Sequence, residues 1–154
     1  MTYKEWREAR QAEVNKLPLF FAFSMKQFEE ELAKRGLTLE EAKGKVYRLG
    51  TCGGYYLKSD AEIIRAFYSR DEAGELKAQM QDAEFAKEAF TYEMYNHEYP
   101  INWQGDWDVV SCFGNVEYEE GKSGEAYLRD LEYPEETIQI YSKARREVCS
   151  ADCW

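Results

Sequence analysis

The sequence predicts an α+β protein in which a small antiparallel sheet of about three strands is covered by several helices. Three observations support this class. Apolar residues recur at helical spacing through most of the chain, two strand-like segments flank the glycine-rich stretch 50–54, and an apolar run at residues 19–23 is too short for a helix. Helices therefore dominate, and the strands fall in the first 60 residues.

Helix starts are indicated by Ser or Thr followed three residues later by Glu or Gln, a capping box that satisfies free backbone N–H groups. This pattern occurs at Thr2–Glu5, Ser24–Gln27, Thr38–Glu41, Ser59–Glu62 and Ser69–Glu72. Pro18 is expected to end the first helix and Gly36 the second. A helix over residues 82–98 and a short one over residues 106–114 follow, and Pro134 fits the first turn of a last helix.

Three strands are expected between these helices. Leu19–Phe23 is apolar throughout, which is typical of a central strand that is buried on both faces. Val46–Leu49 and Tyr55–Lys58 are expected to form a hairpin around Gly50–Gly54, whose glycines permit positive φ angles.

Composition indicates a single domain over residues 1–154 with an acidic C-terminal half. The chain is 44% apolar and contains 12 Tyr, 8 Phe and 4 Trp, enough to build a core. No run approaches the roughly 20 apolar residues that span a bilayer, and the N-terminus lacks the apolar middle of a signal peptide, so we expect no membrane association and a cytoplasmic location. The cysteines are then expected as thiols. Cys149 and Cys153 could share a zinc ion, but the chain has one His and no second cysteine pair, so no metal or other cofactor is expected.

Acidic residues are concentrated in the second part of the chain. Residues 1–58 hold 11 Lys or Arg and 8 Asp or Glu, a net charge of +3, whereas residues 59–154 hold 9 and 22, a net charge of −13. A field of that sign repels nucleic acid and attracts basic protein surfaces, so direct nucleic-acid binding is not expected. The alternative is that the acidic surface only keeps the protein soluble.

A polar cluster ends the inner face of the helix predicted over residues 82–98. That face is formed by Phe85, Ala86, Ala89, Phe90 and Tyr92, and Glu93, Asn96 and His97 fall on the same arc. Glu93 and His97 are four residues apart, so the carboxylate can orient the imidazole. The cluster is either a set of mutually satisfied polar groups or the centre of a small enzyme or ligand-binding module. Because a complete catalytic site needs further groups, an enzyme is not expected.

Aromatic rings alternate with carboxylates in the acidic half. In an acidic protein this pattern favours a protein interface, where rings supply contact area and carboxylates meet Arg and Lys; the alternative is that the rings are core and the acids ordinary surface. The predicted partner-binding residues are Glu84, Glu88, Glu98, Asp106, Asp108, Glu117, Glu119 and Glu120, with Trp103, Trp107 and Tyr118 as aromatic anchors.

Three segments carry a resemblance to a known family. They are Leu19-Phe-Phe-Ala-Phe23 before the helix with Gln27, Leu49-Gly-Thr-Cys-Gly-Gly-Tyr-Tyr-Leu-Lys58, and Tyr92-Glu-Met-Tyr-Asn-His-Glu-Tyr99. They resemble a family of small uncharacterised proteins encoded by phages and mobile elements of Gram-positive gut bacteria, and Asn96-His-Glu-Tyr99 is the most specific part. The resemblance implies no catalytic residue. It implies a setting in which small acidic proteins often disarm host defence nucleases.

The sequence therefore predicts a non-enzymatic inhibitor of the anti-CRISPR or anti-restriction type in the cytoplasm of a bacterial host. Its carboxylates would occupy the basic nucleic-acid channel of a partner such as a Cas effector or a restriction nuclease, where phosphates otherwise bind. Two alternatives stay open. One is an enzyme or ligand-binding module centred on Glu93, Asn96 and His97, and the other is an accessory protein with a basic partner unrelated to defence. The sequence does not determine the oligomeric state.

Overall fold

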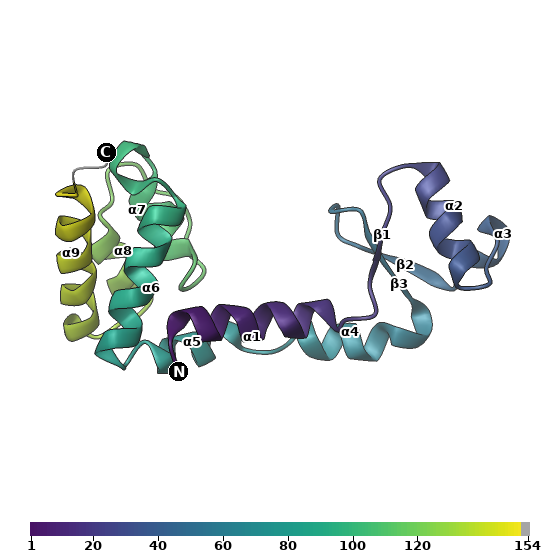
Figure 1. Cartoon of the computed structure of the whole chain (residues 1–154), viewed down its shortest axis with the longest axis horizontal. Coiled ribbons are helices and arrows are strands. Elements are labelled where there is room, and N and C mark those ends of the chain that lie inside the picture. The colour runs from purple at the N-terminus through teal and green to yellow at the C-terminus, as the bar shows by residue number, and fades with distance from the viewer. Residues whose placement is uncertain (152–154) are drawn as a thin grey trace. The chain divides into compact units, whose positions relative to one another are not determined.

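The computed structural model describes residues 1–151 and confirms the α+β class. The chain divides into two compact units, whose elements are labelled in Figure 1. Unit 1 consists of Met1–Ala9 and Asp71–Trp154, and unit 2 consists of Arg10–Arg70, so the boundary falls inside helix α1 (Tyr3–Asn15). The prediction of a single domain stays a prediction. Within residues 1–151, no helix combines the length and the apolar composition that crossing a membrane requires.

Unit 2 contains the three-stranded antiparallel sheet that the structure shows within residues 1–151. Strands β1 (Phe20–Phe21), β2 (Val46–Leu49) and β3 (Gly54–Leu57) lie in the order β1-β3-β2, so β3 is the central strand. As predicted, β2 and β3 form a hairpin. Gly50 and Gly53 adopt φ angles of +55° and +78° in its turn, a conformation that L side chains rarely tolerate.

The predicted central strand at residues 19–23 is wrong. Only Phe20–Phe21 pairs with the sheet, and it lies at the edge. Phe20 is buried, but Phe21 is 50% exposed and Phe23 is 77% exposed. The uninterrupted apolar run suggested burial on both faces, and periodicity alone cannot distinguish that arrangement from an edge strand with an exposed apolar face.

Helices α2 (Met25–Lys34) and α3 (Leu39–Ala42) pack with the sheet around a small core of Phe20, Leu32 and Ala42. Both begin at predicted caps. The Ser24 hydroxyl accepts a hydrogen bond from the N–H of Gln27, and the Thr38 hydroxyl accepts one from the N–H of Glu41. The 3-10 turn η1 (Lys58–Asp60) and helix α4 (Ala61–Tyr68) complete the unit.

The caps predicted at Ser59 and Ser69 are wrong. Asp60 precedes α4, and Asp71 caps α5 (Glu72–Gln79) through a hydrogen bond to its first turn. Asp is as strong an N-cap residue as Ser, so a start shifted by one or two residues is equally compatible with the sequence. The capping box at Thr2, in contrast, is confirmed by reciprocal bonds of 2.8 and 3.1 Å with Glu5.

Unit 1 is helical. It contains the first part of α1 and the whole of α5. The remaining elements are α6 (Ala83–Asn96), η2 (Tyr99–Ile101), α7 (Gly105–Ser111), α8 (Gly124–Asp130) and α9 (Glu135–Cys149). Helix α6 packs along α9, which is yellow in Figure 1. Phe90 of α6 is fully buried and makes edge-to-face contacts with Phe113 and Tyr141, with ring centroids 5.0 and 5.1 Å apart. These contacts form the centre of the large core of unit 1.

The helices predicted over residues 82–98 and 106–114 correspond to α6 and α7, and the predicted last helix corresponds to α9. No helix was predicted between residue 114 and Pro134, where α8 lies. The structure shows that Ser123 caps α8 by accepting a hydrogen bond from the N–H of Ala126. Seven residues are too few for helical periodicity to be recognisable in the sequence.

Candidate functional site

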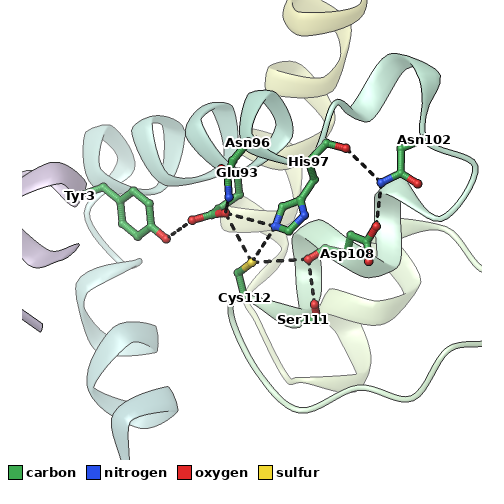
Figure 2. A network of polar contacts seen from close by, with 8 residues as sticks. All are labelled: Tyr3, Glu93, Asn96, His97, Asn102, Asp108, Ser111 and Cys112. Atoms are coloured by element: carbon green, nitrogen blue, oxygen red, sulfur yellow. Dashed lines mark hydrogen bonds and ion pairs between the residues drawn. The ribbon is translucent and has the colours of Figure 1, made fainter. Parts of the chain in front are cut away.

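Glu93, His97 and Cys112 converge where α6 and α7 end (Figure 2). Glu93 and His97 come from the last turns of α6, and Cys112 is the C-terminal capping residue of α7. His97 Nε2 lies 3.4 Å from Glu93 Oε2, Cys112 Sγ lies 3.5 Å from the same oxygen, and Cys112 Sγ lies 3.4 Å from His97 Nε2. We refer to these three residues as the Glu93–His97–Cys112 cluster.

Two further side chains hold the Glu93 carboxylate. The Tyr3 hydroxyl, from the start of α1, donates a 2.6 Å hydrogen bond to Glu93 Oε1, and the Asn96 amide donates a 3.2 Å bond to Oε2. Glu93 is only 6% exposed. A buried carboxylate is costly unless its oxygens accept hydrogen bonds, so these donors are what allow it to be buried.

Asn102 links the ends of the two helices. Its side-chain amide donates to the carbonyl oxygen of His97 at 3.0 Å and to Asp108 Oδ2 at 2.7 Å. The carbonyl oxygen of Asp108 lies 3.5 Å from Cys112 Sγ and accepts a 2.8 Å bond from the Ser111 hydroxyl. This network, drawn in Figure 2, fixes the thiol-bearing end of α7 relative to the imidazole.

Burial, reinforced by the neighbouring Glu93 carboxylate, raises the pKa of the Cys112 thiol to about 12. Burial and the hydrogen bond to Glu93 likewise raise the pKa of Tyr3. Both groups are therefore protonated at neutral pH and act as donors. A thiol in this state is a weak nucleophile, because the thiolate is the reactive form.

The structure places the residues of the predicted inner face unevenly. Glu93 is buried as expected, but Tyr92 is 36% exposed and Asn96 is exposed as well, so their predicted position on the inner face is wrong. Met94 is fully buried instead. The Arg7 guanidinium covers part of the exposed Tyr92 ring and lies 3.5 Å from the centroid of that ring.

Tyr3 was not predicted at this site, and the sequence could not show whether Cys52 or Cys112 would approach it; the structure places Cys112 there. Tyr3 is 90 residues from Glu93, and Cys112 is 15 residues beyond His97, so neither has a local spacing signal. An i, i+4 carboxylate and imidazole pair needs partners, and only the tertiary fold shows which residues supply them.

Three of the predicted partner-binding acids have internal roles. Glu88, expected to face solvent, is half-buried and accepts hydrogen bonds of 3.0 and 3.2 Å from two backbone N–H groups at the start of α1. The Asp106 carboxylate accepts hydrogen bonds from the Tyr99 hydroxyl at 2.8 Å and from the Tyr141 hydroxyl. Asp108, bonded to Asn102, is a third such case.

Other predicted acids remain on the surface. Glu84, Glu98, Glu117 and Glu120 are exposed, and their carboxylates have no hydrogen bond or ion pair with another of the described residues. Glu119 is exposed and forms an ion pair with Lys122 at 3.1 Å. Glu84, Glu98, Glu117 and Glu120 are therefore free to meet a partner.

The three predicted aromatic anchors come together. The Tyr118 ring makes edge-to-face contacts with Trp103 and Trp107, at 6.0 Å between centroids in each case, although Trp103 itself is 81% exposed. They line a cavity of about 420 Å³, together with Tyr99, Asp106 and Glu119. We call this the aromatic cavity.

Fold and site together define a small α+β protein whose helical unit buries a carboxylate beside an imidazole and a thiol. Residues 2–127 match the model of DUF7659, a family of unknown function, and the chain belongs to this family. The matched range includes the Glu93–His97–Cys112 cluster, Tyr3 and the three aromatic anchors. No curated protein and no solved structure matches the chain. The expected link to phages and mobile elements stays a prediction.

Proposed function

We propose that this protein is a non-enzymatic binding protein that docks on a basic protein surface through the aromatic cavity and the acids around it. More specifically, the partner protein would be a nucleic-acid-binding defence protein of a bacterial host, such as a Cas effector or a restriction nuclease. The protein would act in the cytoplasm and inhibit this partner by occupying the sites of nucleic-acid phosphates.

The observation that carries the proposal is the exposure of Trp103 beside Tyr118 and Trp107. A tryptophan that is 81% exposed loses the favourable burial of a large apolar surface, and tryptophan is enriched among residues that dominate binding energy. Glu119 lines the same cavity, beside its ion-pair partner Lys122. Rings and carboxylates at one site suit an Arg or Lys side chain, which gains both a cation–π contact and a charge-assisted hydrogen bond.

Net charge supports a basic partner. Unit 1 contains 9 basic and 22 acidic residues, a net charge of −13. Such a field increases the association rate with a positively charged surface and does not favour direct contact with nucleic acid. The exposed Glu98, Glu117 and Glu120 are the acids best suited to this role, because Glu88, Asp106 and Asp108 already have internal partners.

The proposal is tested by measuring which basic proteins a tagged form retains, at about 0.1 M salt and again at about 0.5 M, where surface charges are screened. We expect retention of a nucleic-acid-binding protein that DNA or RNA displaces, and inhibition of its nuclease activity by the purified protein. Trp103→Ala should weaken binding at least about tenfold, as for a central tryptophan anchor.

A matched control is Phe23→Ala, which removes an equally exposed aromatic side chain from unit 2 and should leave binding unchanged. Replacing Glu98, Glu117, Glu119 and Glu120 by Lys reverses four surface charges and should abolish binding to the partner. If this fourfold variant still binds and inhibits, phosphate mimicry is wrong. If the retained partner is basic but unrelated to nucleic acid, the coarser proposal holds and the defence role fails.

A ligand-binding role for the Glu93–His97–Cys112 cluster is the second candidate function. The observation that favours it is the approach of a third ligand-type residue, Cys112, to the predicted Glu93 and His97 pair. Loss of function in a His97→Ala, Glu93→Gln variant that still unfolds cooperatively would favour this candidate over docking.

A further inference from the structure

We propose that Glu93, His97 and Cys112 form a binding site for a divalent metal ion of the zinc class, with Oε2, Nε2 and Sγ as the ligand atoms. All three atoms lie within 4.8 Å of one another, and they come from two helices of the same compact unit. The inference is independent of the docking surface proposed above, because it concerns different side chains.

The three distances between the ligand atoms fit a tetrahedral site. Bonds of about 2.0–2.1 Å from zinc to nitrogen or oxygen and about 2.3 Å to sulfur give tetrahedral edges of about 3.3 Å between N and O, and about 3.5 Å from S to either. The measured separations are 3.4 Å for Nε2 to Oε2, 3.5 Å for Sγ to Oε2 and 3.4 Å for Sγ to Nε2. One face of a tetrahedron is thus already formed.

The two separations from Cys112 Sγ are also compatible with a thiol donor, but the separation between His97 and Glu93 is a poor match to a hydrogen bond. An imidazole N–H that donates to a carboxylate normally approaches to about 2.7–2.9 Å, because the bond is charge-assisted. His97 Nε2 and Glu93 Oε2 are instead 3.4 Å apart, while Tyr3 approaches the other Glu93 oxygen to 2.6 Å. The short hydrogen bond, from Tyr3, thus lies outside the cluster. The wide separation lies between His97 and Glu93, where a metal ion would be bound.

The donor set indicates zinc rather than magnesium or calcium. Thiolate and imidazole are soft or intermediate ligands that suit zinc and cobalt, whereas magnesium and calcium prefer oxygen ligands alone. Cys112 would bind as a thiolate and release its proton to solvent. Three protein ligands leave a fourth position for water or a small ligand, which is typical of open zinc sites.

The cluster borders open space at its Cys112 side. Cys112 lines a cavity of about 510 Å³ that Trp107, Ser111 and Val116 also border. The His97 side chain is 30% exposed, while the Glu93 side chain is 7% exposed. The cluster therefore has one buried ligand and two ligands near the surface.

Surrounding hydrogen bonds orient the ligands, as in established metal sites. The Tyr3 hydroxyl holds Glu93 Oε1 and leaves Oε2 directed at the cluster, and the Asn96 amide supports the same carboxylate. Asn102 fixes the backbone of His97 relative to Asp108, one turn before Cys112. Tyr3 and Asn96 are therefore positioning residues for a metal ligand.

This proposal departs from the sequence prediction, which considered zinc only at Cys149 and Cys153 and expected no metal. Cys149 is exposed, and Cys153 lies outside the described residues. The cluster instead uses a cysteine that is remote in sequence from the other two ligands.

The test is titration of the full-length, chelator-treated protein with Zn²⁺ by calorimetry and with Co²⁺ by absorption spectroscopy. We expect one equivalent of each ion to bind. The Co²⁺ complex should show a thiolate-to-metal charge-transfer band and the intense visible bands of four-coordinate cobalt. Cys112→Ser should remove the charge-transfer band and weaken zinc binding by more than about 100-fold, beyond the usual effect of losing a supporting residue.

Two cysteine controls separate this site from adventitious thiol binding. Cys52→Ser and Cys149→Ser remove exposed thiols and should leave both titrations unchanged. Tyr3→Phe should weaken zinc binding about 10- to 100-fold without removing the charge-transfer band, because it takes away a positioning hydrogen bond and no ligand. A merely structural role for Tyr3 would lower stability and leave metal affinity intact.

Several results would overturn the proposal. Wild-type protein that binds no zinc, or a Co²⁺ complex without thiolate ligation, contradicts it directly. So does Cys112→Ser protein that binds zinc as tightly as wild type. If Cys112→Ser does not fold, the Co²⁺ spectrum of folded wild-type protein, with the Cys52 and Cys149 variants, still decides the question.

Discussion

Unit 1 and unit 2 are both built from short capped helices rich in aromatic residues, yet they differ in core size and in charge. Unit 1 has a continuous core from Tyr3 to Val148 and a net charge of −13. The core cluster of unit 2 has only three buried residues, Phe20, Leu32 and Ala42, although Ala22 and Ile64 are also buried in this unit. The 11 basic and 8 acidic residues of unit 2 give a net charge of +3.

The comparison shows where polar chemistry can be buried. Taking a carboxylate out of water is costly, and only a unit with a large apolar core has the stability to offset it. Glu93 is buried in unit 1, where the Cys112 thiol and the Asp106 carboxylate are half-buried. The buried charged residue of unit 2 is Arg10, which pairs with Glu13. Both units leave large apolar side chains exposed, among them Phe23 in unit 2 and Trp103 in unit 1.

The largest expected contrast between the units is in thiol reactivity. In the metal-free protein, Cys112 should react with iodoacetamide much more slowly at pH 8 than the exposed Cys52, because burial and the Glu93 carboxylate raise its pKa to about 12 and so lower its thiolate fraction. The rate at Cys112 should rise about tenfold per pH unit until the protein unfolds. Alkylation of two single-cysteine proteins, followed by mass spectrometry, measures both rates. Equal rates would mean that the cluster is open to solvent.

Removing Phe90 should produce the largest loss of stability. Phe90→Ala deletes a fully buried ring from the centre of unit 1 and should cost about 3–5 kcal/mol of unfolding free energy. Urea denaturation followed by circular dichroism gives the change. A loss below about 1 kcal/mol would show that the core of unit 1 is loosely packed.

Leu32→Ala should cost less, about 2–3 kcal/mol, because the core around it is smaller. Its effect should be confined to unit 2. Hydrogen exchange resolved along the chain should show faster exchange in α2 and the sheet, with α6 unchanged. Equal acceleration of exchange in α6 would mean that the two units unfold together and are not independently stable.

Tyr3→Phe should destabilise unit 1 by about 1–3 kcal/mol, since it removes a donor from a buried carboxylate. The matched change in unit 2 is Tyr47→Phe, where the side chain is exposed and the expected cost is about 0.5 kcal/mol or less. Thermal unfolding of both variants compares them. Equal costs would show that the hydrogen bond to Glu93 contributes nothing specific.

The smallest effects should be equal in the two units. Ser24→Ala in unit 2 and Ser123→Ala in unit 1 each remove a helix cap and should each cost about 1 kcal/mol. Chemical denaturation of both variants measures this. A cost that differs several-fold would indicate that local structure, and not only the core, distinguishes the units.

Many local features of the fold could be predicted from the sequence, although Asp60 and Asp71 replaced two predicted caps, and long-range features could not. The caps at Thr2, Ser24 and Thr38 and the hairpin turn depend on neighbouring residues, so their patterns were sufficient. The edge position of β1 depends on which strand lies beside it, and that information is absent from an apolar run.

The same distinction applies to the candidate site. Glu93 and His97 could be paired from their spacing alone, and Glu93 is buried as predicted. Cys112 and Tyr3 could not be added, because their approach depends on how α7 and α1 pack against α6. The internal roles of Glu88 and Asp106 were missed for the same reason, since a count of charges does not show which of them are bonded within the fold.

The division of the chain also has a consequence for synthesis on the ribosome. Unit 2 is a continuous stretch, Arg10–Arg70, so all of its residues are synthesised before the second part of unit 1. Tyr3 is synthesised before unit 2, and its partner Glu93 follows 90 residues later. Because domains generally fold as units during translation, unit 2 should acquire its structure first. The cluster that contains Glu93 should then form late.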